Sequence, residues 1–155
     1  MAKPAVETLE NRSLLDASAF VRGLYANILE RPSPSAAEVN GWVNQIQNGL
    51  SLQTVSADFI NSSEHMAVIV KNDYSNFFGR AADQQGLNFW VQQMTNGMSQ
   101  DQVASQFLGS EEFLMKHGST NYDFINGVYE TVLGRDVDNA GFAYWNEQLI
   151  VETDH

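Results

Sequence analysis

The chain has 155 residues, of which 43% are hydrophobic and 17% are charged, a balance typical of a folded globular protein. Its 19 acidic residues outnumber its 8 lysines and arginines, and the net charge of −11 would repel nucleic acid and acidic membranes. The absence of cysteine excludes disulfides, zinc–thiolate sites and thiol catalysis. No apolar run approaches the about 20 residues of a membrane span, and we recognise no cleavable signal peptide.

Residues 1–18 form a polar leading segment that contains Pro4. Leu14 and Leu15 could begin a helix there, and Asp16 or Ser18 could cap the next helix at its N-terminus. We therefore expect residues 1–18 to be a separate docking or assembly segment in front of the remaining chain.

The remaining chain repeats itself three times, in register on three arginines. A tyrosine lies six residues before each arginine, and a tryptophan lies in the segment that follows. These positions are Tyr25, Arg31 and Trp42; Tyr74, Arg80 and Trp90; and Tyr129, Arg135 and Trp145. The expected repeats cover residues 19–66, 67–118 and 119–155, and we expect them to form one compact domain.

Each repeat is predicted to begin with an amphipathic helix, because its apolar residues fall on one stripe of a helical period. Gly79 and Gly134 lie near the end of this helix, where a glycine suits a left-handed cap. Asp83 and Asp138 follow in a short loop, where aspartate is a good N-cap for a second helix. In the first repeat, Glu30 and a Pro/Ser-rich insert replace the glycine and the aspartate.

The first two repeats share a predicted third helix, in which valine and phenylalanine lie four residues apart on one face. Its matched residues are Ser51, Val55, Phe59, Ser62 and Glu64 in the first repeat and Ser99, Val103, Phe107, Ser110 and Glu112 in the second. The third repeat lacks this helix, because the sequence ends at His155 soon after the second helix. We therefore predict an all-α fold of about eight helices in three tandem helix–loop–helix repeats.

The combined pattern is Tyr-x5-Arg, Asp-x-x-Gly, Trp, Asn-Gly-x-Ser and Phe-x-x-Ser-x-Glu. It resembles a repeated domain of unknown function that occurs in bacterial secreted, surface-layer and RTX-type proteins. The Gly-Arg-x-x-Asp-x-x-Gly turn is also similar to the turns of phycobilisome linker domains, which are helical assembly scaffolds. Residues 6–15 resemble a Leu-Glu-x-Arg-x-Leu-Leu motif near the start of large extracellular bacterial proteins. These resemblances imply an extracellular or cell-surface protein, and neither repeat family supplies a catalytic residue.

One loop offers a candidate calcium site. Asp136, Asp138 and Gly141 match positions 1, 3 and 6 of an EF-hand loop, and Glu147 falls at position 12. Position 5 is Ala140, however, and the repeat alignment makes Asp138 a helix N-cap. The aligned loop of the second repeat does not carry the pattern, which counts against calcium. We expect no cofactor, with calcium as the one alternative.

Two functions remain open from the sequence. In the first, the protein is a non-enzymatic structural protein that associates with itself head-to-tail into filaments or arrays. Apolar residues of the incomplete third repeat, Trp145 and Leu149, would then contact Leu9, Leu14 and Leu15 of the next copy. In the alternative, the chain is a calcium- or glycan-binding surface module.

Overall fold

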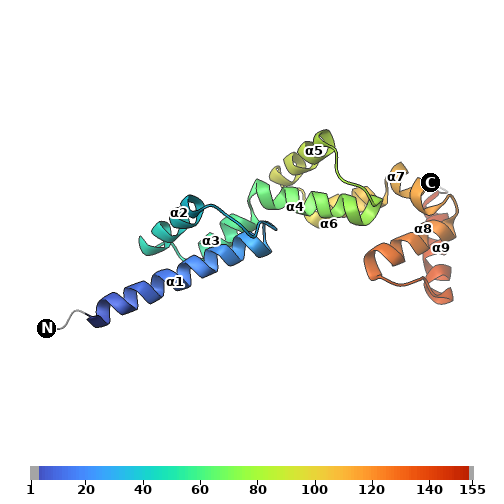
Figure 1. The fold of residues 1–155 in the computed structure, drawn as a ribbon. Helices are drawn as coiled ribbons and strands as arrows, with labels where there is room; N and C mark the ends of the chain where they lie inside the picture. Colours follow the sequence, from blue (N-terminus) through green and yellow to red (C-terminus); the bar gives the residue numbers. More distant parts are fainter. Residues whose placement is uncertain (1–3, 154–155) are drawn as a thin grey trace. The chain divides into compact units, whose positions relative to one another are not determined.

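The computed structural model describes the backbone of residues 4–153 and the side chains of residues 16–150 (Figure 1). Within this part of the chain the secondary structure is helical throughout, with nine α-helices and two short π-helical turns. The prediction of an all-α repeat fold is therefore confirmed. The chain divides into two compact units, Met1–Val68 and Ile69–His155, and this division lies close to the expected boundary between the first and second repeats.

The first unit is built around the long helix α1. It contains α1 (Pro4–Asn27), α2 (Ala36–Gln47), α3 (Leu52–Ile60) and the start of α4 (Ser63–Asp73). Figure 1 shows α2 and α3 lying along α1. The second unit contains the remainder of α4, followed by η1 (Tyr74–Phe78), α5 (Gln84–Thr95), α6 (Gln100–Leu108), α7 (Glu111–His117), α8 (Asn121–Val128), η2 (Tyr129–Leu133) and α9 (Asn139–Thr153).

Helix α1 runs without a break through Asp16 and Ser18, so the predicted cap at these residues was wrong. The sequence between Pro4 and Gly23 contains neither glycine nor proline and is rich in alanine, leucine and glutamate, which propagate a helix. The leading segment is therefore continuous with the first helix of the first repeat.

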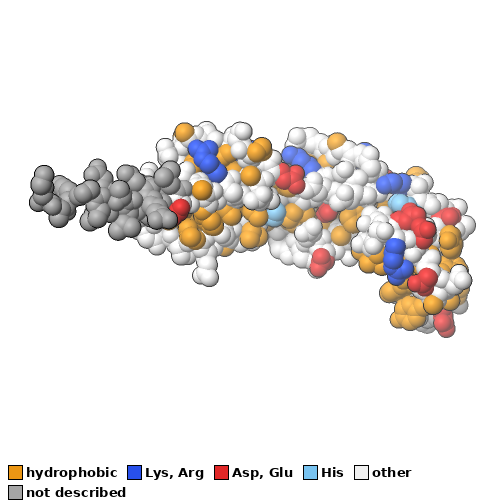
Figure 2. Space-filling view, turned by 60° about the horizontal axis from the view of Figure 1, so that its bottom comes forward, with side chains coloured by type: hydrophobic (Ala, Val, Ile, Leu, Met, Phe, Trp, Pro, Cys, Tyr) orange, Lys and Arg blue, Asp and Glu red, His pale blue; other side chains and the backbone are white. Residues whose placement is uncertain are grey.

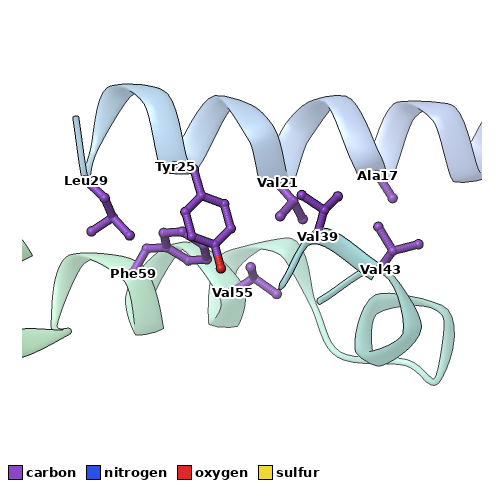
Figure 3. Packing of buried hydrophobic residues seen from close by; sticks show 8 residues of the cluster. All are labelled: Ala17, Val21, Tyr25, Leu29, Val39, Val43, Val55 and Phe59. Atoms are coloured by element: carbon purple, nitrogen blue, oxygen red, sulfur yellow. The ribbon is translucent and has the colours of Figure 1, made fainter. Parts of the chain in front are cut away.

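The core of the first unit lies between one stripe of α1 and the facing sides of α2 and α3 (Figure 3). The α1 residues recur every fourth position, which places them on one face of the helix. The cluster consists of Ala17, Val21 and Tyr25 of α1, Leu29 just after this helix, Val39 and Val43 of α2, and Val55 and Phe59 of α3. Burial of this apolar surface holds the three helices together.

The predicted helix ends are confirmed by the backbone. Gly79 and Gly134 adopt left-handed φ angles of 69° and 66° after the π-helical turns. Glu30 adopts the same region with a φ of 51°, although it has a side chain that disfavours it. The side chains of Asp83, Ser51 and Ser99 accept hydrogen bonds from the first turns of α5, α3 and α6.

The third helices of the first two repeats are shorter than predicted. Helices α3 and α6 end before Ser62 and Ser110, and these serines cap the next helix instead. Their hydroxyls accept hydrogen bonds from the amides of His65 and Phe113. Glu64 and Glu112 therefore lie in the first turn of the following helix, because a serine cap starts a new helix there.

Asp73 is a buried carboxylate at a position that is apolar in the other two repeats. Its residue exposure is 6%, and its Oδ2 atom has no hydrogen-bond partner. The corresponding residues in register are Leu24 and Val128. Burial raises the pKa of Asp73 to about 6, because desolvation disfavours the ionised form.

We predict that Asp73→Asn stabilises the protein at pH 7.5 by about 2 kcal/mol, because it removes a buried charge without changing the shape of the side chain. The folded pKa lies above that of an unfolded aspartate, so the parent protein gains stability as the pH falls through 6 towards 4. The difference in the free energy of unfolding between parent and variant, measured with urea, should therefore shrink as the pH falls from about 6 to 4. Exposed Asp101→Asn is the control, and a pH-independent effect of Asp73→Asn would contradict the assignment.

Candidate interaction surface on the third repeat

Each repeat stacks its arginine on its tyrosine. The guanidinium carbon lies 4.7 Å from the ring centroid in the Arg31–Tyr25 pair and 5.0 Å in the Arg80–Tyr74 pair. In the third repeat, Arg135 lies 4.9 Å from the ring of Tyr129. The six-residue spacing in the sequence thus corresponds to a recurring cation–π contact at the end of the first helix.

In the first two repeats the same arginine also binds the glutamate of the Phe-x-x-Ser-x-Glu motif. Arg80 donates to both carboxylate oxygens of Glu112, at 2.5 Å and 2.8 Å. The hydrogen bond from Arg80 lowers the pKa of Glu112. Arg31 lies 3.2 Å from Glu64. These pairs connect the end of the first helix to the residues that directly follow the third helix.

The first repeat adds a second carboxylate to this arrangement. Glu38 lies 2.5 Å from Arg31, and it also accepts hydrogen bonds from the backbone amide and hydroxyl of Ser35. The hydrogen bond from the Ser35 hydroxyl, followed by those from its amide and from Arg31, lowers the pKa of Glu38 to about 2. Ser35 and Glu38 form a capping box at the start of α2.

The Asp-x-x-Gly motif combines an N-cap with a close approach to the tyrosine. The Asp83 carboxylate accepts a hydrogen bond from the amide of Gly86 at 2.8 Å, and Asp138 accepts one from Gly141 at 2.7 Å. A Cβ atom at Gly86 would overlap the hydroxyl of Tyr74, and the equivalent atom at Gly141 would lie 2.6 Å from the Tyr129 hydroxyl. Glycine is therefore required for packing at this position.

A phenylalanine from the third helix lies between the tyrosine and the tryptophan of the first two repeats. The ring centroid of Phe107 is 5.0 Å from that of Tyr74 and 5.0 Å from that of Trp90. Phe59 lies 4.9 Å from Tyr25 and 5.3 Å from Trp42. This central phenylalanine joins the three helices of each repeat through edge-on and tilted ring contacts.

The third repeat has the tyrosine and the tryptophan without a phenylalanine between them. The indole Nε1 of Trp145 donates a hydrogen bond to the hydroxyl of Tyr129 at 3.2 Å. An open groove of about 300 Å³ lies beside these rings. It is lined by Leu108, Phe124, Ile125, Val128, Tyr129, Trp145 and Leu149. Figure 2 shows hydrophobic side chains at the surface of this part of the chain.

Three apolar side chains of the third repeat are more exposed than their counterparts, which are buried or half-buried. Val132 and Leu133 are 55% and 56% exposed, and Trp145 is 47% exposed. Phe77, which corresponds to Val132, is only 7% exposed, and Leu29, which corresponds to Leu133, is also buried. Trp145 also lines the groove, and a contiguous apolar surface is a candidate interaction site.

Arg135 carries a weaker set of partners than the other two arginines. It lies 3.4 Å from the Asp138 carboxylate and donates to the carbonyl of Asp136 at 3.2 Å. No residue of the described chain supplies the carboxylate that Glu64 and Glu112 supply in the first two repeats. The third repeat thus presents an exposed cation near an apolar groove.

The predicted assembly residues fall into two groups. Trp145 and Leu149 both line the groove, and their contact with another copy stays a prediction. The side chains of Leu9, Leu14 and Leu15 lie outside the described residues, so their contacts with another copy stay a prediction.

The predicted calcium residues have separate structural positions. The Asp138 carboxylate accepts hydrogen bonds from backbone amides at the start of α9, chiefly that of Gly141, which lowers its pKa. Glu147 is exposed on α9. Among the described residues, no three His, Asp or Glu side chains gather closely enough to hold a metal ion. Calcium binding by Asp136, Asp138 and Glu147 therefore stays a prediction.

Sequence reasoning missed the rest of the groove. Leu108 belongs to α6 of the second repeat, and only the fold brings it beside Phe124 and Val128. Helical periodicity could have indicated Ile125 and Val128, because they lie on the same apolar stripe as Tyr129. No helix in the described part of the chain is long and apolar enough to span a membrane.

The comparison with known families gives one result. Residues 8–69, 67–116 and 104–155 each match the family model described as "Domain of unknown function (DUF4214)". These matches confirm that a domain of unknown function is repeated along the chain. No curated protein and no solved structure matches the chain.

We predict that Gly86→Ala destabilises the second repeat by about 1–3 kcal/mol, because the new methyl group overlaps the Tyr74 hydroxyl. Gly41→Ala is the matched control within a helix, since no atom outside its own helix lies near that position, and it should stabilise by about 0.5–1 kcal/mol. Adding Tyr74→Phe to the Gly86→Ala variant removes the overlapping hydroxyl and should recover part of the lost free energy of unfolding. Equal effects at the two glycines in urea unfolding would contradict the packing role.

Proposed function

This chain belongs to the family described as "Domain of unknown function (DUF4214)", and from that premise we propose a structural role in assembly. In this proposal the protein is a non-enzymatic module of the bacterial surface or extracellular space. It associates head-to-tail with further helical repeats, including copies of itself, into filaments or arrays. The groove of the third repeat is the observation that carries this proposal.

The groove supports assembly because its lining is apolar and open to solvent. Trp145 and Leu149 of α9 face it from one side, and Phe124 and Val128 of α8 contribute to the other. The corresponding tryptophans of the first two repeats are covered by Phe59 and Phe107. A partner that covered the groove would remove its apolar side chains from water, as Phe59 and Phe107 do for the rings they contact. This burial favours association.

A head-to-tail contact fits the position of this groove in the chain. Apart from Leu108, the residues that line this groove belong to the third repeat, whereas Phe59 and Phe107 lie against the corresponding rings of the first two repeats. A contact between this groove and a different surface of the next molecule is heterologous, and such contacts produce rings or open filaments. The leading segment, residues 1–18, is the surface that the sequence analysis assigns to the other side of the contact.

The polar groups of the described chain support a role without catalysis. The glutamates and the aspartate with lowered pKa values are Glu38, Glu112 and Asp138, and each binds an arginine or caps a helix. Burial lowers the pKa of His117, which packs against the ring of Phe113 at 4.3 Å. Caps and ion pairs thus explain the lowered pKa values of the three carboxylates, and burial explains the lowered pKa of His117 and the raised pKa of Asp73.

Glycan binding is the alternative that a specific observation favours. Tyr122, Tyr144 and Trp145 are exposed aromatic side chains on α8 and α9, and such rings can stack on sugars. The polar atoms of the groove rings, the Tyr129 hydroxyl and the Trp145 nitrogen, already bind each other. A sugar would find few hydrogen-bonding groups in this groove, so we favour a protein partner.

We predict that the purified protein forms species larger than its 17.3 kDa monomer in both calcium and EDTA, measured by size exclusion with light scattering. Trp145→Ser should reduce their size, because it removes the largest exposed ring of the groove. Tyr144→Ser is the matched control, since the adjacent residue is exposed on the same helix but does not line the groove.

Assemblies that require calcium would instead favour the calcium-binding function and the Asp136 loop. A monomer in both buffers at high protein concentration would contradict self-association. Melting temperatures of both serine variants verify that a change in size does not arise from unfolding.

A further inference from the structure

We infer that the groove of the third repeat receives an α-helix of the type that α3 and α6 provide in the first two repeats. The occupant is a helix that carries the pattern Val-x3-Phe-x2-Ser-x-Glu. This inference rests on the proposal that the groove is a docking surface, and it specifies the chemistry of the partner.

The positions of the aromatic rings favour a helix of this type. In the second repeat, Phe107 contacts Tyr74 and Trp90, and Val103 one turn earlier is fully buried. In the third repeat, Tyr129 and Trp145 occupy the corresponding positions and line the groove. A helix that carries valine and phenylalanine four residues apart would therefore present the side chains that these two rings bind elsewhere in the chain.

The volume of the groove also fits two apolar side chains. Its about 300 Å³ is roughly twice the volume of a cavity that holds benzene, about 150 Å³. A phenylalanine ring and a neighbouring aliphatic side chain are of this size. The groove can thus receive the two apolar residues of the motif.

The positive charge of Arg135 complements the glutamate of this helix motif. Arg31 and Arg80 bind Glu64 and Glu112, which follow the phenylalanine of the third helix by five residues. Arg135 stacks on its tyrosine in the same way. A docked helix with the pattern Val-x3-Phe-x2-Ser-x-Glu would bring a carboxylate to this arginine.

Other parts of an identical copy match this chemistry less well. Residues 1–18 contain no phenylalanine, and the motif is absent from them. The motif residues of α3 and α6, including Phe59 and Phe107, are buried in their own repeats, so a copy would have to release a helix to offer one.

The experiment titrates a synthetic peptide of residues 98–114, which contains the α6 motif, into the intact protein by isothermal titration calorimetry. We expect saturable one-to-one binding. Phe107→Ala in the peptide should weaken binding by about tenfold or more, because it removes the central ring.

A charge reversal tests the orientation of the helix. Arg135→Glu in the protein should weaken binding about tenfold, and the peptide with Glu112→Arg should restore it with this variant only. Arg22→Glu is the matched control, because it changes the net charge equally at an exposed position on α1. Circular dichroism verifies that both protein variants remain folded.

The outcomes separate this inference from self-association. A monomeric protein that binds the peptide supports the inference and contradicts assembly of identical copies. An assembled protein that ignores this peptide but binds a peptide of residues 4–18 overturns the inference and supports the leading segment of a second copy as the occupant. Peptide binding that Phe107→Ala and Arg135→Glu leave unchanged also overturns the inference.

Discussion

The structure of each complete repeat depends on one phenylalanine that lies between a tyrosine and a tryptophan. Phe59 and Phe107 come from the third helices, whereas their ring partners come from the first and second helices. One side chain thus joins three helices, of which the second and third have only 9 to 12 residues. Short helices are marginal alone, so this shared packing determines whether the repeat is stable.

The recurring polar residues position this aromatic cluster. The arginine covers the outer face of the tyrosine and binds a glutamate just beyond the third helix. The aspartate starts the second helix, and the glycine three residues later leaves room for the tyrosine hydroxyl. The repeated Tyr, Arg, Asp and Gly pattern is therefore explained by folding.

Local signals in the sequence predicted most of the fold. Helical periodicity, the Asp83 cap and the glycine at 79 each act within a few residues, so they could be recognised directly. The pairing of Arg80 with Glu112 and the contribution of Leu108 to the groove depend on residues brought together by packing. Buried Asp73 also escaped prediction, because a lone acidic residue in a helix usually faces solvent.

The central claim is that the third repeat resembles the second repeat without its third helix. Native-state amide hydrogen exchange tests it most directly, because exchange reports the free energy of local opening. Lower opening free energies are expected for α8 and the described part of α9 than for η1 and α5, whose rings Tyr74 and Trp90 contact Phe107. Equal protection of the two repeats in a verified monomer would contradict the claim.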